Sequence, residues 1–428
     1  MTISRLAAPG FLLVSLALSA CATGPESAPQ LPSTTSAPGT WHMVAIGDHG
    51  YDLRYLEAED YTPPRTSEQF VAEARADWLK DKRPPAEFTA GPQAIHRPSG
   101  SVVAASGLMP VANAMDSWCQ AHPCQFGVLL GDNIYPDGAT LGADGKNDAD
   151  RFRHNFADPY GRFGRFAGEF RFYTTLGNHD WHTSREAAMA QVDYLARTKP
   201  FYMDGLIYRV SPPETRGEVE IFVIDTQTLL AGRTFMEDEL ADDGSEMPSV
   251  KMESPEPWEK PMTAQEADQA GWLAAALKSS RARWKIVIGH HPLWASSGGK
   301  YRQSEALRAA ILPVLCEHAD LYLAGHEHTL EAFADDCTTA LPGSAVRPLP
   351  AIVSGAGGKQ RPLNTNFMRQ QLVRNPGLKQ LHVQGMVWGA AHLTLAPETA
   401  TITFITTPND GGGKAVASGT YSFARRTR

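Results

Sequence analysis

The sequence lacks an excess of basic residues. Its 39 Lys and Arg residues face 47 Asp and Glu residues, which gives a net charge of −8 at pH 7. A nucleic-acid-binding surface normally needs a basic patch, so we expect no nucleic-acid partner. The same deficit excludes a general electrostatic attraction to anions. An anionic ligand would therefore need a local source of positive charge, such as bound metal ions.

Cysteine is also scarce, and none of the five cysteines lies at a Cys-x-x-Cys spacing. We therefore assign them no catalytic role. Four of them lie in the body of the chain, and an even number in an oxidising compartment predicts two disulfide bonds, with three pairings open. These four are Cys119, Cys124, Cys316 and Cys337.

The sequence contains no apolar run long enough to span a bilayer, which takes about 20 residues. The run from Phe11 to Ala20 holds ten residues and follows Arg5, an arrangement typical of an export signal. Its end, Leu18-Ser19-Ala20-Cys21, resembles the lipobox of bacterial lipoproteins, so we predict a signal peptide over residues 1–20 and lipidation of Cys21. Cleavage after Ala22 would instead release a soluble protein. In either case we expect export. The lipidated form would be anchored to a bacterial outer membrane, on the periplasmic or the surface side of that membrane.

Three segments differ in composition from the rest of the chain. Residues 21–40 are rich in Pro, Ser and Thr, which predicts a disordered tether before a single large domain over residues 41–428. Residues 51–101 are long for a connection inside a domain and predict an insertion or lid. We expect one helix in this segment, over residues 67–80, where Phe70, Ala74 and Trp78 indicate a packing face. The acidic segment 237–259 predicts a solvated loop.

Five short apolar runs in the large domain share one plan. Each is followed by a glycine and then by a polar side chain that can bind a metal ion. Helical patterns lie between these runs and further strands follow, which predicts a layered α/β domain with sheet at its centre. One such pair is more often a turn than a ligand, but five are hard to explain as turns. Sites in α/β sheets gather beyond the carboxyl ends of the strands. The five polar residues are Asp48, Asp132, Asn178, His290 and His326.

Two further donors lie close to these residues. Tyr135 stands three residues after Asp132, and His328 stands two residues after His326. The full set holds oxygen and nitrogen donors without thiolate, which suits one hard ion beside a second divalent ion. Two ions about 3.5–4 Å apart need a shared carboxylate, and Asp132 is the candidate.

These motifs resemble those of the calcineurin-like metallophosphoesterases, and within them the short purple acid phosphatases. The resemblance covers about residues 42–408 and implies a four-layer α/β/β/α sandwich with mixed sheets. The matching blocks, in the family's order, are Gly47-Asp48, Gly131-Asp132-Asn133-Ile134-Tyr135, Gly177-Asn178-His179-Asp180, Val287-Ile288-Gly289-His290 and Gly325-His326-Glu327-His328.

The resemblance implies a role for each residue of these blocks. Ferric iron would be bound by Asp48, Asp132, Tyr135 and His328. Zinc, manganese or ferrous iron would be bound by Asp132, Asn178, His290 and His326. His179 resembles the general acid, with Asp180 orienting it. His291, together with Asn178, is expected near the phosphate.

The implied activity is hydrolysis of phosphate monoesters by in-line attack of a metal-bound hydroxide. A phosphodiesterase or nucleotide hydrolase would use the same site, and a surface lipoprotein that only binds phosphate ligands is a further alternative. The sequence departs from the family at His49, where the short purple acid phosphatases usually carry tryptophan, and in the insertion 51–101.

Overall fold

The computed structural model describes residues 36–231, 256–296, 301–409 and 412–426, together with the backbone of four short strands between 235 and 253. The predicted signal peptide 1–20, Cys21 and most of the tether 21–40 lie outside the described residues. So does most of the acidic segment 237–259, apart from those strands and residues 256–259.

The first of two seven-stranded sheets has the order β20-β19-β18-β1-β4-β5-β6. Its parallel half starts at the beginning of the domain, and its antiparallel half comes from the end of the chain. The parallel strands are β1 (Trp41–Ile46), β4 (Phe126–Leu130), β5 (Phe172–Thr175) and β6 (Phe201–Tyr202), and the antiparallel ones are β18 (Trp388–Leu395), β19 (Thr399–Thr407) and β20 (Val416–Ala424).

The second sheet has the order β17-β15-β16-β14-β13-β8-β7. Its four central strands are parallel, and its outer strands are antiparallel to their neighbours. The central strands are β8 (Val219–Val223), β13 (Trp284–Ile288), β14 (Leu321–Ala324) and β16 (Leu349–Ser354), and the outer ones are β7 (Tyr208–Val210), β15 (Leu330–Asp335) and β17 (Leu378–Gln384).

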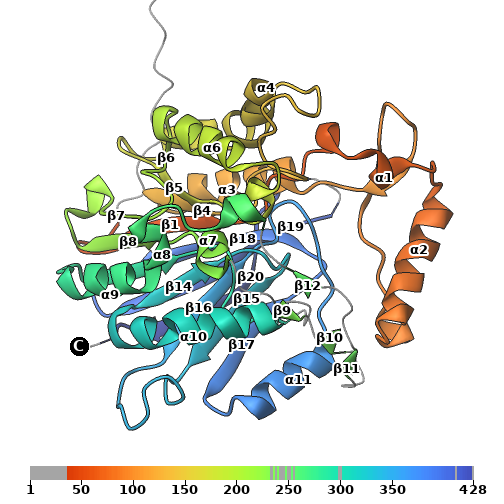
Figure 1. Ribbon diagram of the computed structural model, residues 1–428. Helices are drawn as coiled ribbons and strands as arrows, with labels where there is room; N and C mark the ends of the chain where they lie inside the picture. Colours follow the sequence, from red (N-terminus) through yellow and green to blue (C-terminus); the bar gives the residue numbers. More distant parts are fainter. Residues whose placement is uncertain are drawn as a thin grey trace, which may run out of the picture.

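The two sheets pack face to face between two layers of helices (Figure 1). Strand β13 shows why: Ile286 and Ile288 point into the core between the sheets, whereas Val287 points into the core beneath the helices of the second sheet. Alternate residues of a strand face opposite sides, so a run that is apolar throughout is buried on both faces. Helices α3 (Leu108–Ala121) and α6 (Arg185–Arg197) cover the first sheet, and α9 (Gln269–Ser279) and α10 (Tyr301–His318) cover the second. The predicted four-layer α/β/β/α sandwich with mixed sheets is confirmed.

The apolar pattern that follows Thr263 is typical of one helix, but the structure has two pieces here. Thr263 caps α8 (Ala264–Ala267), but Asp268 leaves the helical conformation and caps α9 with its own side chain. A second N-cap inside one apolar pattern ends the first helix and starts the next.

Other short elements are α4 (Asp148–Phe152), α5 (Asp158–Tyr160), α7 (Thr226–Leu230), α11 (Thr365–Arg374), β9 (Phe235–Met236), β10 (Glu239–Leu240), β11 (Glu246–Met247) and β12 (Met252–Glu253).

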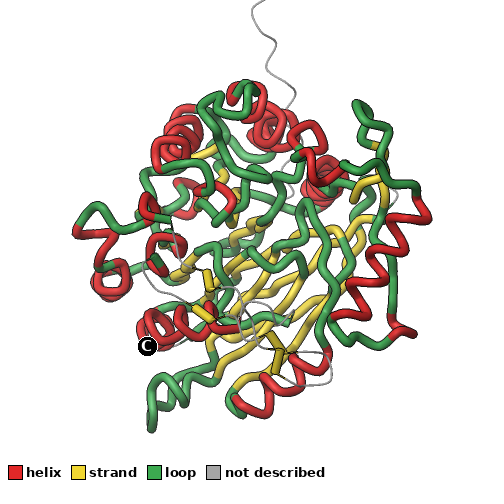
Figure 2. The backbone as a smooth tube through the Cα atoms, turned by 45° about the vertical axis from the view of Figure 1, so that its right-hand side comes forward, coloured by secondary structure: helices red, strands yellow, loops and turns green. Residues whose placement is uncertain are grey.

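The segment 51–101 lies beside the two sheets rather than within them (Figures 1 and 2). It holds α1 (Ala58–Tyr61), α2 (Ser67–Lys80) and β2 (Gln93–Ile95), which pairs with β3 (Val102–Ala104). Helix α2 begins after a capping box at Thr66 and has the predicted bounds.

The four cysteines of the domain form two disulfide bonds. Cys119 is joined to Cys124, which ties the end of α3 to the start of β4. Cys316 is joined to Cys337, which ties α10 to the segment after β15. Of the three pairings that the sequence allowed, this is the most local one. Among the described residues, no helix combines the length and the apolar character that crossing a membrane requires.

Candidate metal centre

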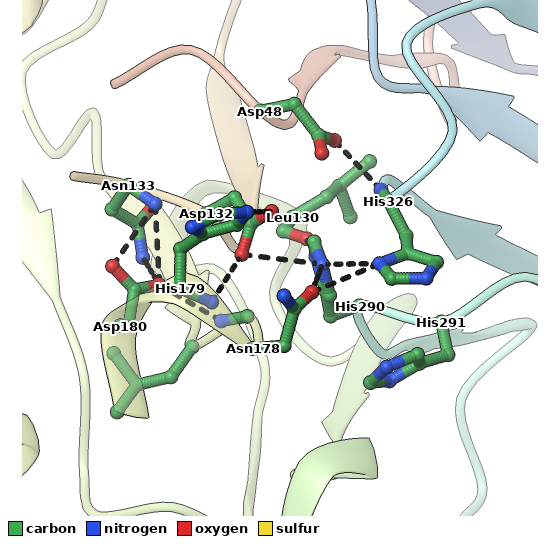
Figure 3. Close-up of polar contacts among 12 residues, drawn as sticks. Asp48, Leu130, Asp132, Asn133, Asn178, His179, Asp180, His290, His291 and His326 are labelled. Atoms are coloured by element: carbon green, nitrogen blue, oxygen red, sulfur yellow. Dashed lines mark hydrogen bonds and ion pairs between the residues drawn. The ribbon is translucent and has the colours of Figure 1, made fainter. Parts of the chain in front are cut away.

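The five predicted polar residues converge where the two sheets meet. They follow β1, β4, β5, β13 and β14, and in Figure 3 their side chains point towards one another. Three of them have a left-handed backbone, with φ of 55° at Asp48, 50° at Asp132 and 70° at His326. Such a conformation is strained in residues other than glycine, and strain of this kind gathers at functional sites.

The glycines of the motifs allow the loops to approach each other. A Cβ on Gly177 would overlap the carboxylate and the backbone nitrogen of Asp132, and a Cβ on Gly325 would overlap the carboxylate of Asp48. At these two positions glycine is therefore a steric requirement, because the next loop occupies the space of its side chain.

The first group of donor atoms surrounds the hydroxyl of Tyr135. The hydroxyl oxygen lies 2.9 Å from Asp132 Oδ2, 3.1 Å from Asp48 Oδ1 and 3.2 Å from His328 Nε2. His328 Nε2 lies 3.6 Å from Asp48 Oδ1. Four side chains from three strand ends therefore bring their donor atoms to one place.

The second group surrounds the amide oxygen of Asn178. This oxygen lies 3.1 Å from His290 Nε2 and 3.0 Å from His326 Nδ1, and the two nitrogens are 3.1 Å apart. His290 Nε2 is also 3.3 Å from Asp132 Oδ1. Asp132 thus serves both groups with one oxygen each, which is the bridging geometry expected from the sequence.

His290 shows that the second group needs a cation. Its Nδ1 lies 2.8 Å from the carbonyl of Leu130, which only accepts hydrogen bonds, so the proton sits on Nδ1. The lone pair of Nε2 then faces the oxygens of Asp132 and Asn178, which are acceptors too. Buried acceptors that converge in this way are stabilised by a positive ion at their centre. The donor set therefore fits two metal ions bound by oxygen and imidazole nitrogen.

The pKa shifts indicate the same need for positive charge. Burial by itself would lower the pKa of His290, but the carboxylate of Asp132 outweighs it and the pKa rises to about 9, so a second proton on Nε2 supplies the positive charge whenever a metal ion does not. Burial and the two aspartates raise the pKa of Tyr135 well above its usual value, so its ionisation requires a strong local cation. Burial and the charges of Arg361 and Lys359 hold the pKa of His328 well below its usual value, which keeps it in the neutral form that binds metals.

His179 lies beside both groups without joining either. Its backbone nitrogen donates to Asp132 Oδ1 at 3.0 Å, and its Nε2 is 4.0 Å from Asp132 Oδ2. The ring packs against Tyr135, with 4.3 Å between ring centroids. Its Nδ1 lies 2.5 Å from the carbonyl of Pro136, so this carbonyl sets the orientation of the ring.

Asp180 has a different role from the one expected. We predicted that it orients His179, but its carboxylate accepts hydrogen bonds from the backbone N–H groups of Gly177 at 2.8 Å, Asn133 at 3.1 Å and Ile134 at 3.2 Å. These bonds hold the loop of Asp132 against the loop of Asn178. Burial and the charge of Asp132 raise the pKa of Asp180 to about 7. Asp180 therefore positions the loops of the site rather than the ring of His179.

The other histidines near the site are placed as supports. His291 is fully buried behind His326, with 4.4 Å between ring centroids, and its Nδ1 is bonded to the Thr226 hydroxyl at 2.7 Å. This burial favours positioning of His326 over the phosphate contact that we predicted for His291. His182 pairs with Asp137 at 3.1 Å.

The departure at His49 affects packing. Its ring is buried and edge-on to Tyr160, with 4.9 Å between ring centroids, and its Nε2 lies 3.2 Å from Asn133 Oδ1. It therefore supports the loop that follows Asp132.

Sequence reasoning missed two cations beside the first group. The Lys359 ammonium lies 4.9 Å from the ring centre of Tyr135, and Arg361 forms an ion pair at 2.6 Å with Glu327, between His326 and His328. Both follow β16, whose end continues as Ser354-Gly355-Ala356-Gly357-Gly358. This is a sixth apolar strand followed by glycine. The repeated pattern was the signal in the sequence that could have identified this segment as part of the site.

Comparison with known proteins places this arrangement in a family. Residues 110–330 match the calcineurin-like phosphoesterase family. The chain is 27% identical to purple acid phosphatase 17 of Arabidopsis thaliana, over 63% of this chain and 68% of that protein. It is 26% identical to tartrate-resistant acid phosphatase type 5 of Homo sapiens, over 65% of this chain and 75% of that protein.

A solved structure agrees in fold. GAP50, the anchor in the inner membrane complex of Plasmodium, superposes with a TM-score of 0.53 at 15% identity, covering 91% of this chain and 90% of that chain. This likeness concerns the fold alone, whereas the sequence relatives support the purple acid phosphatase resemblance read from the motifs.

Proposed function

Because the chain belongs to the calcineurin-like phosphoesterase family, we propose that it is a phosphatase that hydrolyses phosphate monoesters with two metal ions. The observation that carries the proposal is the pair of donor groups that share Asp132, one oxygen in each. Turns alone do not explain why buried acceptors from five strand ends face one another.

The two groups suit different ions. The first would hold ferric iron through Asp48, Asp132, Tyr135 and His328, because a buried phenol ionises only beside a strong cation. The second would hold zinc, manganese or ferrous iron through Asp132, Asn178, His290 and His326. When bound, such a pair of ions supplies an activated water and positive charge for the phosphoryl oxygens.

The chain's own residues supply the proton and the geometry. As an imidazolium ion, His179 would donate the proton on Nε2 to the oxygen of the leaving alcohol, while its Nδ1–H stays bonded to the Pro136 carbonyl. Burial lowers the pKa of His179 to about 4, so this proton donor forms in acid. Asp180 would keep the loops of Asp132 and Asn178 in register. A general acid of this kind contributes about 10²–10⁴-fold to the rate.

The test compares His179→Ala with His182→Ala on two monoesters. An alkyl phosphate has a poor leaving group, so its hydrolysis should fall by about 10²–10⁴-fold in His179→Ala. 4-Nitrophenyl phosphate has a good leaving group and should lose much less. His182→Ala is the matched control, because its ring adjoins His179 at 4.5 Å but lies outside both donor groups. Unchanged alkyl phosphate turnover in His179→Ala would refute the acid role.

Metal content and colour test the ions. Tyrosinate on ferric iron absorbs visible light, so we expect a purple or pink protein with about two metal ions per chain. A colourless active protein that holds only divalent ions would overturn the iron assignment. Higher turnover of diesters or nucleotides than of monoesters would make the chain a phosphodiesterase or nucleotide hydrolase. Two bound metals without hydrolysis of any ester would make it a phosphate-binding lipoprotein.

We also propose that the protein is exported and lipid-anchored at Cys21. The two disulfide bonds support this proposal, because such bonds persist in oxidising compartments. Expression of Cys21→Ser should move the protein from the membrane fraction to the soluble fraction. Equal membrane association of the variant and the parent would contradict lipidation at this residue.

A further inference from the structure

A cavity of about 290 Å³ lies between the segment 51–101 and the body of the domain. The segment contributes Phe70, Trp78 and Phe88 to its lining. Residues outside the segment, among them Ala104 and Met386, complete the lining. A functional pocket typically has mostly apolar walls and a volume near this size.

The cavity adjoins the candidate metal centre. Tyr51 and Lys359 line it, and both also lie against Tyr135. The rings of Tyr51 and Tyr135 have centroids 6.3 Å apart, and the Lys359 ammonium lies 5.1 Å from the first ring and 4.9 Å from the second. His179 packs on Tyr135 as well, at 4.3 Å. Tyr135 therefore contacts both His179 and two residues of the cavity lining.

The cavity walls are held in place by hydrogen bonds at the junction and within the segment. The backbone nitrogen of Ala105 donates to the Pro92 carbonyl at 2.8 Å, and that of Val102 donates to the Arg65 carbonyl at 2.9 Å. The indole of Trp78 donates to the carbonyl of Pro84 at 2.9 Å. The cavity is therefore a preformed part of the fold, which lowers the entropy cost of binding.

Two polar side chains of the lining are engaged with other groups. The Arg83 guanidinium lies 5.5 Å from the ring centre of Trp78 and pairs with Asp81. The Gln360 amide donates to Asn409 at 2.7 Å. The surface offered to a ligand is thus largely aromatic and aliphatic. Aromatic rings bind such walls through edge-to-face and stacked contacts, as Trp78 and Phe88 already do at 5.7 Å.

Resting on the proposed phosphatase function, we propose that this cavity binds the alcohol part of the substrate and that this part carries an aromatic ring. The volume is about twice the ~150 Å³ that holds benzene. It therefore fits a fused bicyclic ring or a substituted phenyl group. The segment 51–101 is then the part of the chain that selects the substrate, while the strand ends bind its phosphate.

The test fills the cavity and compares two monoesters on the metal-loaded protein. Ala74 lines the cavity from α2, whereas Ala76 is exposed on the same helix and outside the lining. In Ala74→Trp, the ratio of kcat/KM for 1-naphthyl phosphate to that for glycerol 2-phosphate should fall about tenfold. Ala76→Trp should keep the parental ratio. Ala104→Trp fills the cavity from β3, so a local defect in α2 cannot account for the same loss in both variants.

Binding of 1-naphthol, measured by calorimetry, gives a readout that needs no turnover. The parent and Ala76→Trp should bind it, and Ala74→Trp should bind it about tenfold more weakly. Adenosine 5′-phosphate tests the other source of an aromatic ring: a larger loss with this ester than with the naphthyl ester would identify the ring as a nucleobase. Monoester hydrolysis with ratios unchanged in both filled variants would overturn the proposal. Failure of the parent to hydrolyse any ester would instead refute the phosphatase function.

Discussion

His392 should make the protein sensitive to acid. It lies in β18 with 5% of its surface exposed, and its Nε2 bonds to the Pro123 carbonyl at 2.9 Å, beside the Cys119–Cys124 disulfide. Burial, and less strongly the charges of His42 and His122, lower its pKa to about 4. The change that tests this is His392→Gln, because the glutamine amide can donate to the same carbonyl without titrating.

The sign and size of the effect follow from proton binding. An unfolded histidine takes up a proton near pH 6.5, whereas the folded His392 does so only near pH 4. The unfolded state therefore binds more protons in this window, and stability falls as the pH falls from 6.5 to 4. With these two pKa values, the loss at pH 5 is about 2 kcal/mol. It reaches about 3 kcal/mol below pH 4.

Urea unfolding at pH 7.5 and pH 5.0 measures the difference. We expect the parent to lose about 2 kcal/mol more than His392→Gln between these two values. His318→Gln, at the end of α10 and away from this cluster, should follow the parent. Equal losses in the parent and in His392→Gln would refute the reasoning, as would an NMR titration that places the pKa of His392 near 6.5.

Three further outcomes test the site and its frame. Asp180→Asn should weaken metal binding by about 10–100-fold in a metal titration, because the carboxylate holds the two ligand loops together. If the variant instead has normal metal content and is slow only on alkyl esters, Asp180 acts by orienting the general acid His179. Gly177→Ala should cost about 1–3 kcal/mol in urea unfolding and displace the bridging aspartate, whereas Gly168→Ala, which meets open space, should be neutral. Replacing Cys316 and Cys337 by serine opens a loop with a separation of 21 residues and should cost about 3 kcal/mol on the loop-entropy scale; a loss below ~1 kcal/mol would contradict that account.

Much of the donor set could be predicted because each motif is local. The end of an apolar strand, a glycine and a donor side chain occupy only a few consecutive residues, as in Leu129-Leu130-Gly131-Asp132. The direction of parallel strands then brings their carboxyl ends to one edge. The helix after Thr263 shows where local patterns are insufficient: the apolar spacing continues across Asp268, but the side chain of Asp268 caps a new helix.

The sequence by itself determined the layered α/β class and the chemical type of each donor, because strand period, glycine position and side-chain chemistry are properties of short segments. Only the tertiary structure decided which atoms meet. It placed the Pro136 carbonyl where it orients the ring of His179, and it placed the Asp180 carboxylate where it bonds to the backbone of two loops. It also brought Lys359 to Tyr135 and closed a cavity between the segment 51–101 and the body. Those outcomes depend on contacts between residues far apart in the chain, and register and packing set such contacts rather than local spacing.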